Sequence, residues 1–180
     1  MRSSTSQDGS ISLYRNRIFS LKQTLVISAA AIAVLAADQY SKAWIVRVCP
    51  PIQELQQSCR VIIPNLLNWT FERNIHGAFG LFGSSSVMLI GMAIVVLVLF
   101  WFSFREAAAH SQTVRIAFGM IVGGAIGNVV DRLHYGYVID FIDFIGFYHV
   151  WKNIFNVADS CITAGVGLLL LSSLVARRHG

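Results

Sequence analysis

Charged side chains are scarce in this chain: of its 180 residues, 13% are Asp, Glu, Lys or Arg, whereas 55% are hydrophobic. Soluble globular domains usually carry about a quarter charged residues, so the composition argues against that class. Proline is also scarce, at 3 residues, and all of them lie in one segment, as Pro50, Pro51 and Pro64. The long apolar stretches therefore lack the residue that most strongly breaks helices.

Four apolar stretches are long enough for helices that cross a bilayer, which requires about 20 mostly apolar residues. They run over residues 23–46, 84–104, 116–133 and 157–176. Because the hydrocarbon layer offers no water to backbone polar groups, each stretch is predicted to be helical. We therefore expect an all-α membrane protein with four transmembrane helices in one domain, residues 21–180. A Ser-rich cytoplasmic tail over residues 1–20 is expected to be disordered.

Charge is divided unevenly between the two sides of this arrangement. The N-terminal tail, the second connection (Arg105 and Arg115) and the C terminus hold eight of the 14 basic residues, whereas the other side holds seven of the 9 carboxylates. The positive-inside rule then places both termini in the cytoplasm, and the net charge of +5 is no indication of a nucleic-acid partner. A cleaved signal peptide over residues 1–37 is the alternative, but a 22-residue polar lead is long for one.

Cysteine is scarce as well, at 3 residues. Cys49 and Cys59 lie in the first outer connection, where an oxidising compartment would permit a disulfide; two free thiols are the alternative. No His lies at ligand spacing from them, so we predict no metal site. The same connection, residues 47–83, contains an alternating stretch over 66–71, which predicts a small extracytoplasmic β-sheet.

The third apolar stretch carries glycines at intervals of four, Gly119, Gly123 and Gly127, together with Gly124. A ridge of small residues lets a second transmembrane helix approach closely. We interpret this ridge as a packing surface rather than as a ligand site.

Ionisable residues inside the spans lie toward their predicted outer ends, and such residues usually face a protein interior and mark function. Three pairs share a helix face: Asp38 and Lys42, Asn128 and Arg132, and Asn156 and Asp159. A salt bridge that closes the bundle is the expected role of Asp38 and Lys42. For Arg132, snorkelling to lipid headgroups and a fixed hydrogen-bonding role both remain open.

Asp140, Asp143 and Asp159 form a second group, and the first two are flanked by Val, Ile and Phe. Desolvation raises the pKa of a carboxyl group, and two carboxyls that share a site cannot both ionise easily. Such a pair supplies acid and base together: one member takes a proton from attacking water and the other polarises the amide carbonyl. Spacing leaves open whether Asp159 opposes Asp140 or Asp143, and a lone membrane Asp is more often an ion site or a packing residue.

Four blocks together resemble the signal peptidase II family, the lipoprotein signal peptidases, and the likeness runs from about residue 23 to 176. They are Asp38-Gln39-Tyr40-Ser41-Lys42, the glycine-rich block 123–132, the block 138–144 and Phe155-Asn156-Val157-Ala158-Asp159. The resemblance implies a catalytic dyad of Asp140 and Asp159. It also implies that Asn128, Arg132 and Asn156 support the site, and that Asp38 and Lys42 are structural.

The resemblance further implies the activity and its setting. Members of the family cut lipid-modified prolipoproteins just before a diacylglyceryl-modified cysteine. They use four spans, an outer β-cradle and an outer amphipathic helix that grip the lipid and the lipobox, with no metal or cofactor. We therefore expect a monomeric multi-pass protein of the bacterial inner membrane, in contact with membrane lipids, whose active site faces the periplasm.

A fifth block departs from the family pattern, which reads Asn-x-Gly-x-Ala-Phe. Here Asn74, a candidate substrate-binding or site-supporting residue, is followed two residues later by His76 instead of glycine. His76 adds bulk and a titrating group and removes access to glycine-only backbone angles. Substrate preference or activity could differ, and a catalytically silent relative that holds lipidated chains is one alternative. A small ion transporter is a weaker one, because the charges lie toward one face.

Overall fold

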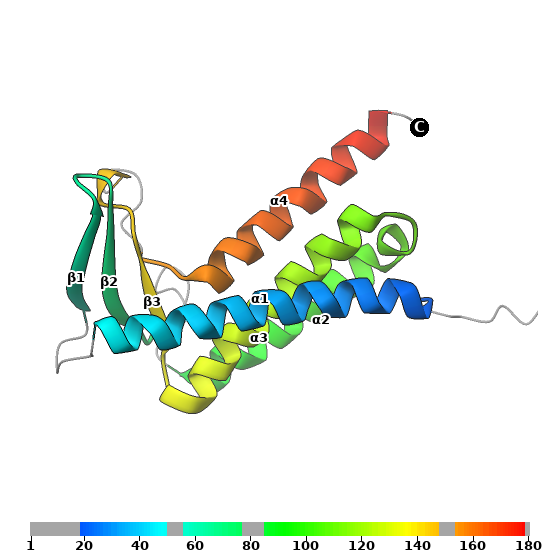
Figure 1. Ribbon diagram of the computed structural model, residues 1–180. Helices are drawn as coiled ribbons and strands as arrows, with labels where there is room; N and C mark the ends of the chain where they lie inside the picture. The colour runs from blue at the N-terminus through cyan, green and yellow to red at the C-terminus, as the bar shows by residue number, and fades with distance from the viewer. Residues whose placement is uncertain (1–18, 50–55, 77–84, 148–153, 179–180) are drawn as a thin grey trace, which may run out of the picture.

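The computed structural model describes residues 19–49, 56–76, 85–147 and 154–178. Nearly all of the tail expected over residues 1–20 lies outside these ranges. Four helices within them are long and apolar enough to cross a membrane, as predicted. They are α1 (Leu21–Val48), α2 (Ser86–His110), α3 (Gln112–Tyr135) and α4 (Val157–Arg178). α3 packs against each of the other three helices, and α1 also contacts α4. In Figure 1, α1 passes in front of α3, and α4 diverges from α1 toward the C terminus.

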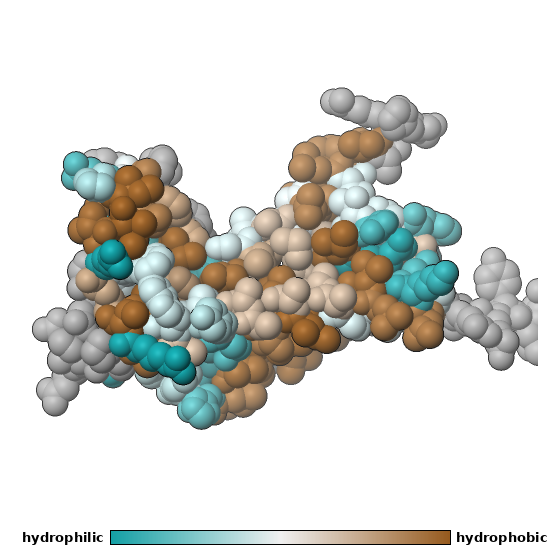
Figure 2. Space-filling view, in the orientation of Figure 1, coloured by the Kyte–Doolittle hydropathy of each residue, from teal (hydrophilic) through white to brown (hydrophobic). Residues whose placement is uncertain are grey.

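Apolar side chains cover much of the outer surface of the helices (Figure 2). On α2, for example, Val95, Leu99 and Phe102 are all exposed. Contiguous exposed apolar side chains mark an interaction surface. On helices that can span a bilayer, that surface faces lipid.

The connection between α2 and α3 is shorter than predicted. We expected a loop that contains Arg105 and Arg115, but Arg105 lies inside α2 and Arg115 inside α3, and Ser111 alone joins the two helices. The Ser111 hydroxyl accepts the Val114 N–H at 3.3 Å and so caps α3. Arg115 donates to the carbonyl of Ala108 at 2.9 Å, which satisfies an end carbonyl of α2. Arg115 thus completes the end of α2, and Arg105 lies within that helix instead of interrupting it.

The glycine ridge of α3 packs against both neighbours, as its spacing predicts. A Cβ at Gly119 would lie 2.6 Å from Ala30 Cβ of α1, and one at Gly124 would lie 2.6 Å from the Ala158 carbonyl of α4. On α4, a Cβ at Gly165 would lie 2.8 Å from the Ala117 carbonyl. Small residues on both sides therefore set the spacing of the bundle.

Replacement of Gly124 by alanine is expected to destabilise the bundle by about 1–3 kcal/mol, because the new methyl group meets backbone that cannot move aside. The measurement is thermal unfolding of the purified protein in detergent. Gly91→Ala is the matched control, since nothing lies within 4 Å of a Cβ at that position of α2. Equal unfolding temperatures for the two variants would contradict the packing argument.

One antiparallel sheet lies at the end of the bundle, with strand order β1-β2-β3. The strands are β1 (Gln56–Ile63), β2 (Leu67–Asn74) and β3 (Val138–Asp143). The small sheet predicted from residues 66–71 is confirmed, and β2 includes residues 67–71 of that stretch. The segment over residues 138–144 was left open as loop or strand, and residues 138–143 of it form β3. Side chains of the sheet, including Phe71, Ile139 and Phe141, form one buried core with Ile45 and Cys49 of α1.

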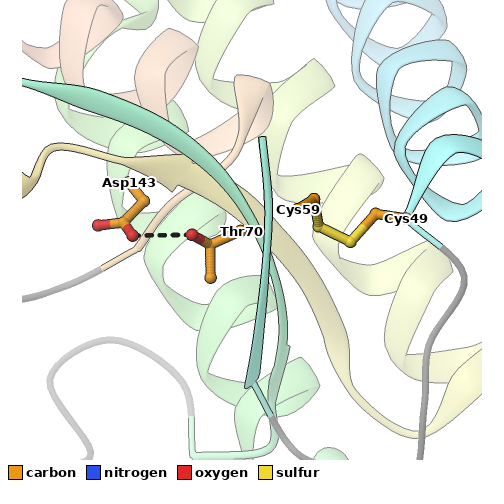
Figure 3. Close-up of a disulfide and its surroundings, with 4 residues drawn as sticks. All are labelled: Cys49, Cys59, Thr70 and Asp143. Carbon is orange, nitrogen blue, oxygen red and sulfur yellow. Dashed lines mark hydrogen bonds between the residues drawn. A yellow bond between two sulfur atoms is a disulfide. The ribbon is translucent and has the colours of Figure 1, made fainter. Parts of the chain in front are cut away.

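A disulfide joins Cys49 at the end of α1 to Cys59 in β1, with the Cα atoms 5.6 Å apart (Figure 3). The pairing that the sequence left open is thus formed in the structure. Trp44 of α1 and Trp69 of β2 also meet edge to face, with ring centroids 4.3 Å apart. The sheet is therefore fastened to the last turns of α1 by a covalent bond, an aromatic contact and a shared core.

Candidate active site

Asp159 lies in the first turn of α4, where it forms a capping box with Asn156. The Asn156 side-chain oxygen accepts the Asp159 N–H at 2.9 Å, and an Asp159 carboxylate oxygen accepts the Asn156 N–H at 3.4 Å. These reciprocal bonds satisfy two amide groups that begin the helix. The helix dipole favours negative charge at this end, so its position alone stabilises an ionised Asp159.

Asp140 lies on β3 and is 1% exposed. The Asn156 side-chain N–H₂ donates to one of its carboxyl oxygens at 2.6 Å, and the Asn74 side-chain N–H₂ donates to the other at 2.7 Å. Burial, followed by the negative charge of Asp159, raises the pKa of Asp140 well above its usual range. Asn74, expected to support the site, thus contacts one of the two aspartates directly.

Asn128 of α3 is a second amide that links the two carboxyl groups. It donates to Asp159 at 2.8 Å, and its oxygen accepts from the Asn156 amide at 3.1 Å. The same oxygen accepts from Lys42 Nζ at 3.0 Å, which fixes the orientation of the amide. Asp140 and Asp159 are therefore brought together by two asparagines, both of which the sequence analysis singled out.

Lys42 is buried, at 2% exposed, and its ammonium group lies between two carboxylates. Its ammonium is 2.7 Å from Asp38 and 2.9 Å from Asp131. Asp38 accepts the Ala158 N–H at 2.9 Å, and Asp131 accepts the Ile139 N–H at 3.0 Å. Each carboxylate thus holds the backbone immediately before one of the two site aspartates. The ion pair expected between Asp38 and Lys42 is present, and Lys42 also pairs with Asp131, which was not predicted.

The sequence analysis did not place Asp131 and Gln39 in the site. The Gln39 amide donates to Asp131 at 3.0 Å and to Asp38 at 3.2 Å, and so bridges α1 and α3. Both residues lie within the quoted blocks, and Asp131 follows Asn128 by three residues, which places it on a similar helix face. That spacing was the signal that could have found it.

Arg132 and Asp143 occupy the edges of the site. Arg132 is half-buried and donates to the Asn128 carbonyl at 3.5 Å, and its charge acts on both Asp140 and Asp159. This contact favours the fixed hydrogen-bonding role over snorkelling. Asp143 instead accepts from the Thr70 hydroxyl at 2.8 Å (Figure 3). Three positions apart on a strand, Asp140 and Asp143 point to opposite faces, so Asp140 is the one that meets Asp159.

Known proteins that resemble this chain identify its family. The model of the family described as signal peptidase (SPase) II matches residues 30–175. This chain belongs to the signal peptidase II family. It is similar to the lipoprotein signal peptidase of Syntrophotalea carbinolica, with 35% identity over 156 residues, 84% of this chain and 92% of the relative. It is also similar to the lipoprotein signal peptidase of Syntrophomonas wolfei, with 38% identity over 139 residues, 77% of this chain and 85% of that one.

Solved structures match as well. A bacterial membrane enzyme determined by the in meso method at 1.9 Å resolution has a TM-score of 0.68 and 31% identity, covering 87% of this chain and 95% of its own. A second, at 2.3 Å, has a TM-score of 0.69 and 29% identity, covering 87% of this chain and 90% of its own. The protein is thus a multi-pass bacterial membrane protein with the fold of a signal peptidase II and is a peptidase.

His76 is where this signal peptidase II departs from the family pattern. It is exposed and lies just beyond the end of β2, two residues after Asn74. The remainder of that block, from Gly77 onward, lies outside the described residues. Within the described part of the chain, no group of three His, Cys, Asp or Glu side chains could hold a metal ion.

Asn156 is expected to serve two separable roles, because its amide oxygen caps α4 while its amide nitrogen holds Asp140. Asn156→Ala should lose both and destabilise the protein by about 0.5–2 kcal/mol, the usual cost of a lost N-cap. Asn156→Ser should restore most of that stability, because a serine hydroxyl also caps, without restoring activity. The comparison requires unfolding temperature and kcat for both variants. Full activity in the serine variant would contradict a role for the nitrogen.

Proposed function

We propose that this signal peptidase II is an aspartic endopeptidase in which Asp140 and Asp159 are the catalytic pair. Its substrates are diacylglyceryl-modified prolipoproteins, which it cuts just before the lipidated cysteine. The observation that carries the proposal is the pair of asparagines, Asn128 and Asn156, whose side-chain amides bond to each other and link the carboxyl group of Asp159 on α4 to that of Asp140 on β3. The lipoprotein signal peptidases that resemble the chain support the choice of substrate.

The environments of the two aspartates support different roles for them. Asp159, at the N-terminus of α4, is the ionised member and takes a proton from the attacking water, while the water oxygen bonds to the scissile carbonyl carbon. Asp140, buried on β3 with a raised pKa, holds the shared proton and donates a hydrogen bond to the carbonyl oxygen. When the tetrahedral intermediate collapses, the C–N bond breaks, and Asp159 passes the proton that it took from water to the leaving nitrogen, which restores its ionised state. Arg132 is positioned to offset the negative charge of the pair.

The pH profile of kcat is expected to be bell-shaped, with two apparent pKa values that belong to the pair. Activity falls as pH rises through the upper value, because the proton that Asp140 must hold is lost. Glu72 lies opposite Asp140 in the β2–β3 ladder, and its charge adds to the rise in the pKa of Asp140. Glu72→Gln should therefore move the alkaline limb to lower pH. An unmoved limb would contradict this electrostatic account.

We further propose that the end of the bundle that carries the sheet faces the periplasm and that both termini are cytoplasmic. The positive-inside distribution supports this orientation. Substrate would then reach the dyad from the outer leaflet, and the β-cradle over about residues 47–83 would lie beside it as part of one domain, residues 21–180. The enzyme acts in the bacterial inner membrane as a monomer in contact with membrane lipids.

The test is cleavage by the purified protein in liposomes of one prolipoprotein supplied in lipidated and unlipidated forms. The lipidated form is expected to be cut before its modified cysteine and the unlipidated form to be left intact. Equal cleavage of both would overturn the proposed specificity. His76→Gly, measured beside the wild-type protein, shows whether the departure at this position alters KM or kcat.

A further inference from the structure

The last three residues of β1, just before the turn into β2, present apolar side chains to the exterior. Val61 is 59%, Ile62 36% and Ile63 45% exposed. The pairing of β1 with β2 shifts register between Val61 and Ile63. This irregularity interrupts the regular strand pattern, in which every second side chain points to the buried face, and all three successive side chains are exposed. We call residues Val61–Leu66 the hairpin tip. Apolar colour extends over this end of the sheet in Figure 2. Consecutive exposed apolar side chains on a hairpin mark a candidate contact surface.

A well-defined turn sets the local geometry of the hairpin tip. Pro64 and Asn65 form its turn, which is closed by the Leu66 N–H on the Ile63 carbonyl at 3.1 Å, and Asn65 has a φ of 60°. These features match a type II turn, where proline precedes a residue with positive φ. Gly146, in the short 3₁₀ helix η2 (Ile145–Phe147), donates to the Leu66 carbonyl at 3.3 Å and supports the turn from β3.

The depth of the tip follows from its attachment to α1, which can span the membrane. The disulfide and the Trp44–Trp69 contact fasten the sheet to the last turns of that helix. Exposed aromatic residues mark the headgroup level of a bilayer, and at this end they include Tyr40 of α1, 77% exposed, and Tyr135 of α3, 46% exposed. In Figure 1 the strands run across the direction of α1 rather than along it, so the tip stays near that level.

The charges around the tip favour a lipid surface over other partners. From residue 55 to residue 71 the sequence holds no acidic residue and one basic residue, Arg60. Arg60 is exposed, next to Val61, where its guanidinium suits a lipid phosphate. Two acidic residues of the sheet, Glu72 and Asp140, pair with each other further along the strands from the tip. Asp143 pairs with Asn68 near the tip, but its carboxylate is buried and accepts from the Thr70 hydroxyl, so it is not presented to the exterior.

We propose that the hairpin tip, Val61–Leu66, is a membrane-contacting element that inserts its apolar side chains into the interface of the leaflet nearest the sheet, with Arg60 at the phosphates. The occupant is bulk bilayer lipid rather than the substrate or a second copy of the chain. The contact gives the sheet a second point of support besides α1. It is independent of the proposed catalytic roles, because a protein with no activity would show it equally.

The test is quenching of a tryptophan at the tip by lipids brominated in the acyl chains. Ile62→Trp and, as a second variant in case the first misfolds, Val61→Trp are placed in phosphatidylcholine liposomes, and the emission of the wild-type protein, with its 4 tryptophans, is subtracted. The added emission should be quenched to the extent seen for Leu133→Trp, an exposed position on the lipid-facing surface near the end of α3. Quenching of the added emission no greater than in unbrominated lipid would overturn the proposal.

Two further outcomes separate the alternatives. If the tip met a second copy of the chain through the exposed edge of β1, the tip tryptophan would escape bromine and its emission would depend on the protein-to-lipid ratio. If it met only the substrate, bromine would quench nothing until lipidated substrate with a brominated chain was added. Either result overturns bilayer contact, whereas quenching without substrate at high lipid dilution supports it.

Discussion

Asp140→Asn and Asp159→Asn are each expected to reduce kcat for a lipidated prolipoprotein by about 10²–10⁴-fold, the usual contribution of a positioned acid or base. Asparagine keeps the size of the side chain and an oxygen that accepts a hydrogen bond, but it neither takes a proton from water nor holds one for the leaving nitrogen. Because the two carboxyls act as a unit, the double variant should lose little more than either single variant. The measurement is single-turnover cleavage in liposomes.

Glu106→Gln is the matched control, since Glu106 is an exposed carboxylate near the end of α2 and belongs to no part of the site. It should retain wild-type kcat. The two aspartate variants should also remain in the membrane fraction at wild-type levels, which separates a catalytic loss from a folding loss. Turnover near the wild-type rate in either aspartate variant would remove that residue from the proposed pair.

Lys42→Met is expected to be the most destabilising single change in the chain, by about 3–5 kcal/mol, because it leaves a buried negative charge without its partner. Two carboxylates lose the same cation at once, since Lys42 Nζ lies 2.7 Å from Asp38 and 2.9 Å from Asp131. Thermal unfolding in detergent and the yield of membrane-inserted protein both report the effect.

Neutral partners should rescue this variant. Lys42→Met combined with Asp38→Asn and Asp131→Asn removes all three charges, and each asparagine retains an oxygen to accept the backbone N–H of Ala158 or Ile139. The triple variant should therefore unfold at a higher temperature than Lys42→Met alone. If it does not, the lysine acts through packing and not through charge.

The arrangement of spans was readable from the sequence because each helix needs a long apolar stretch, and no tertiary contact is required to see one. The glycine ridge was readable for a similar reason, since its spacing of four is itself the helix face. The α2–α3 turn was not, because Arg115 satisfies the end of α2 through a contact that depends on the fold. The charged residues near the helix ends were therefore interpreted as part of a loop.

Some residues of the site could be predicted from the sequence and others could not, again because the latter depend on tertiary contacts. Asn128, Asn156 and Asp159 carry helical spacing that indicates their faces, whereas the choice between Asp140 and Asp143 depended on β3 being a strand with a defined register. Asp131 was overlooked as a site residue, although its spacing from Asn128 indicates a similar helix face, because its contacts with Lys42 and with the Ile139 N–H depend on how α1 and β3 pack against α3. The state of Cys49 and Cys59 likewise required the position of the sheet.

The single carboxamide of Asn156 acts as a spacer between α4 and β3. Its oxygen caps the membrane helix α4, and its nitrogen donates to Asp140 on strand β3. The distance between these two atoms is fixed, because the carboxamide group is planar. Any tilt that α4 adopts to match the thickness of the surrounding bilayer is transmitted to Asp140 through this group. The geometry of the acid–base pair is thereby coupled to the lipid environment, and turnover should vary with acyl-chain length even where the substrate remains the same.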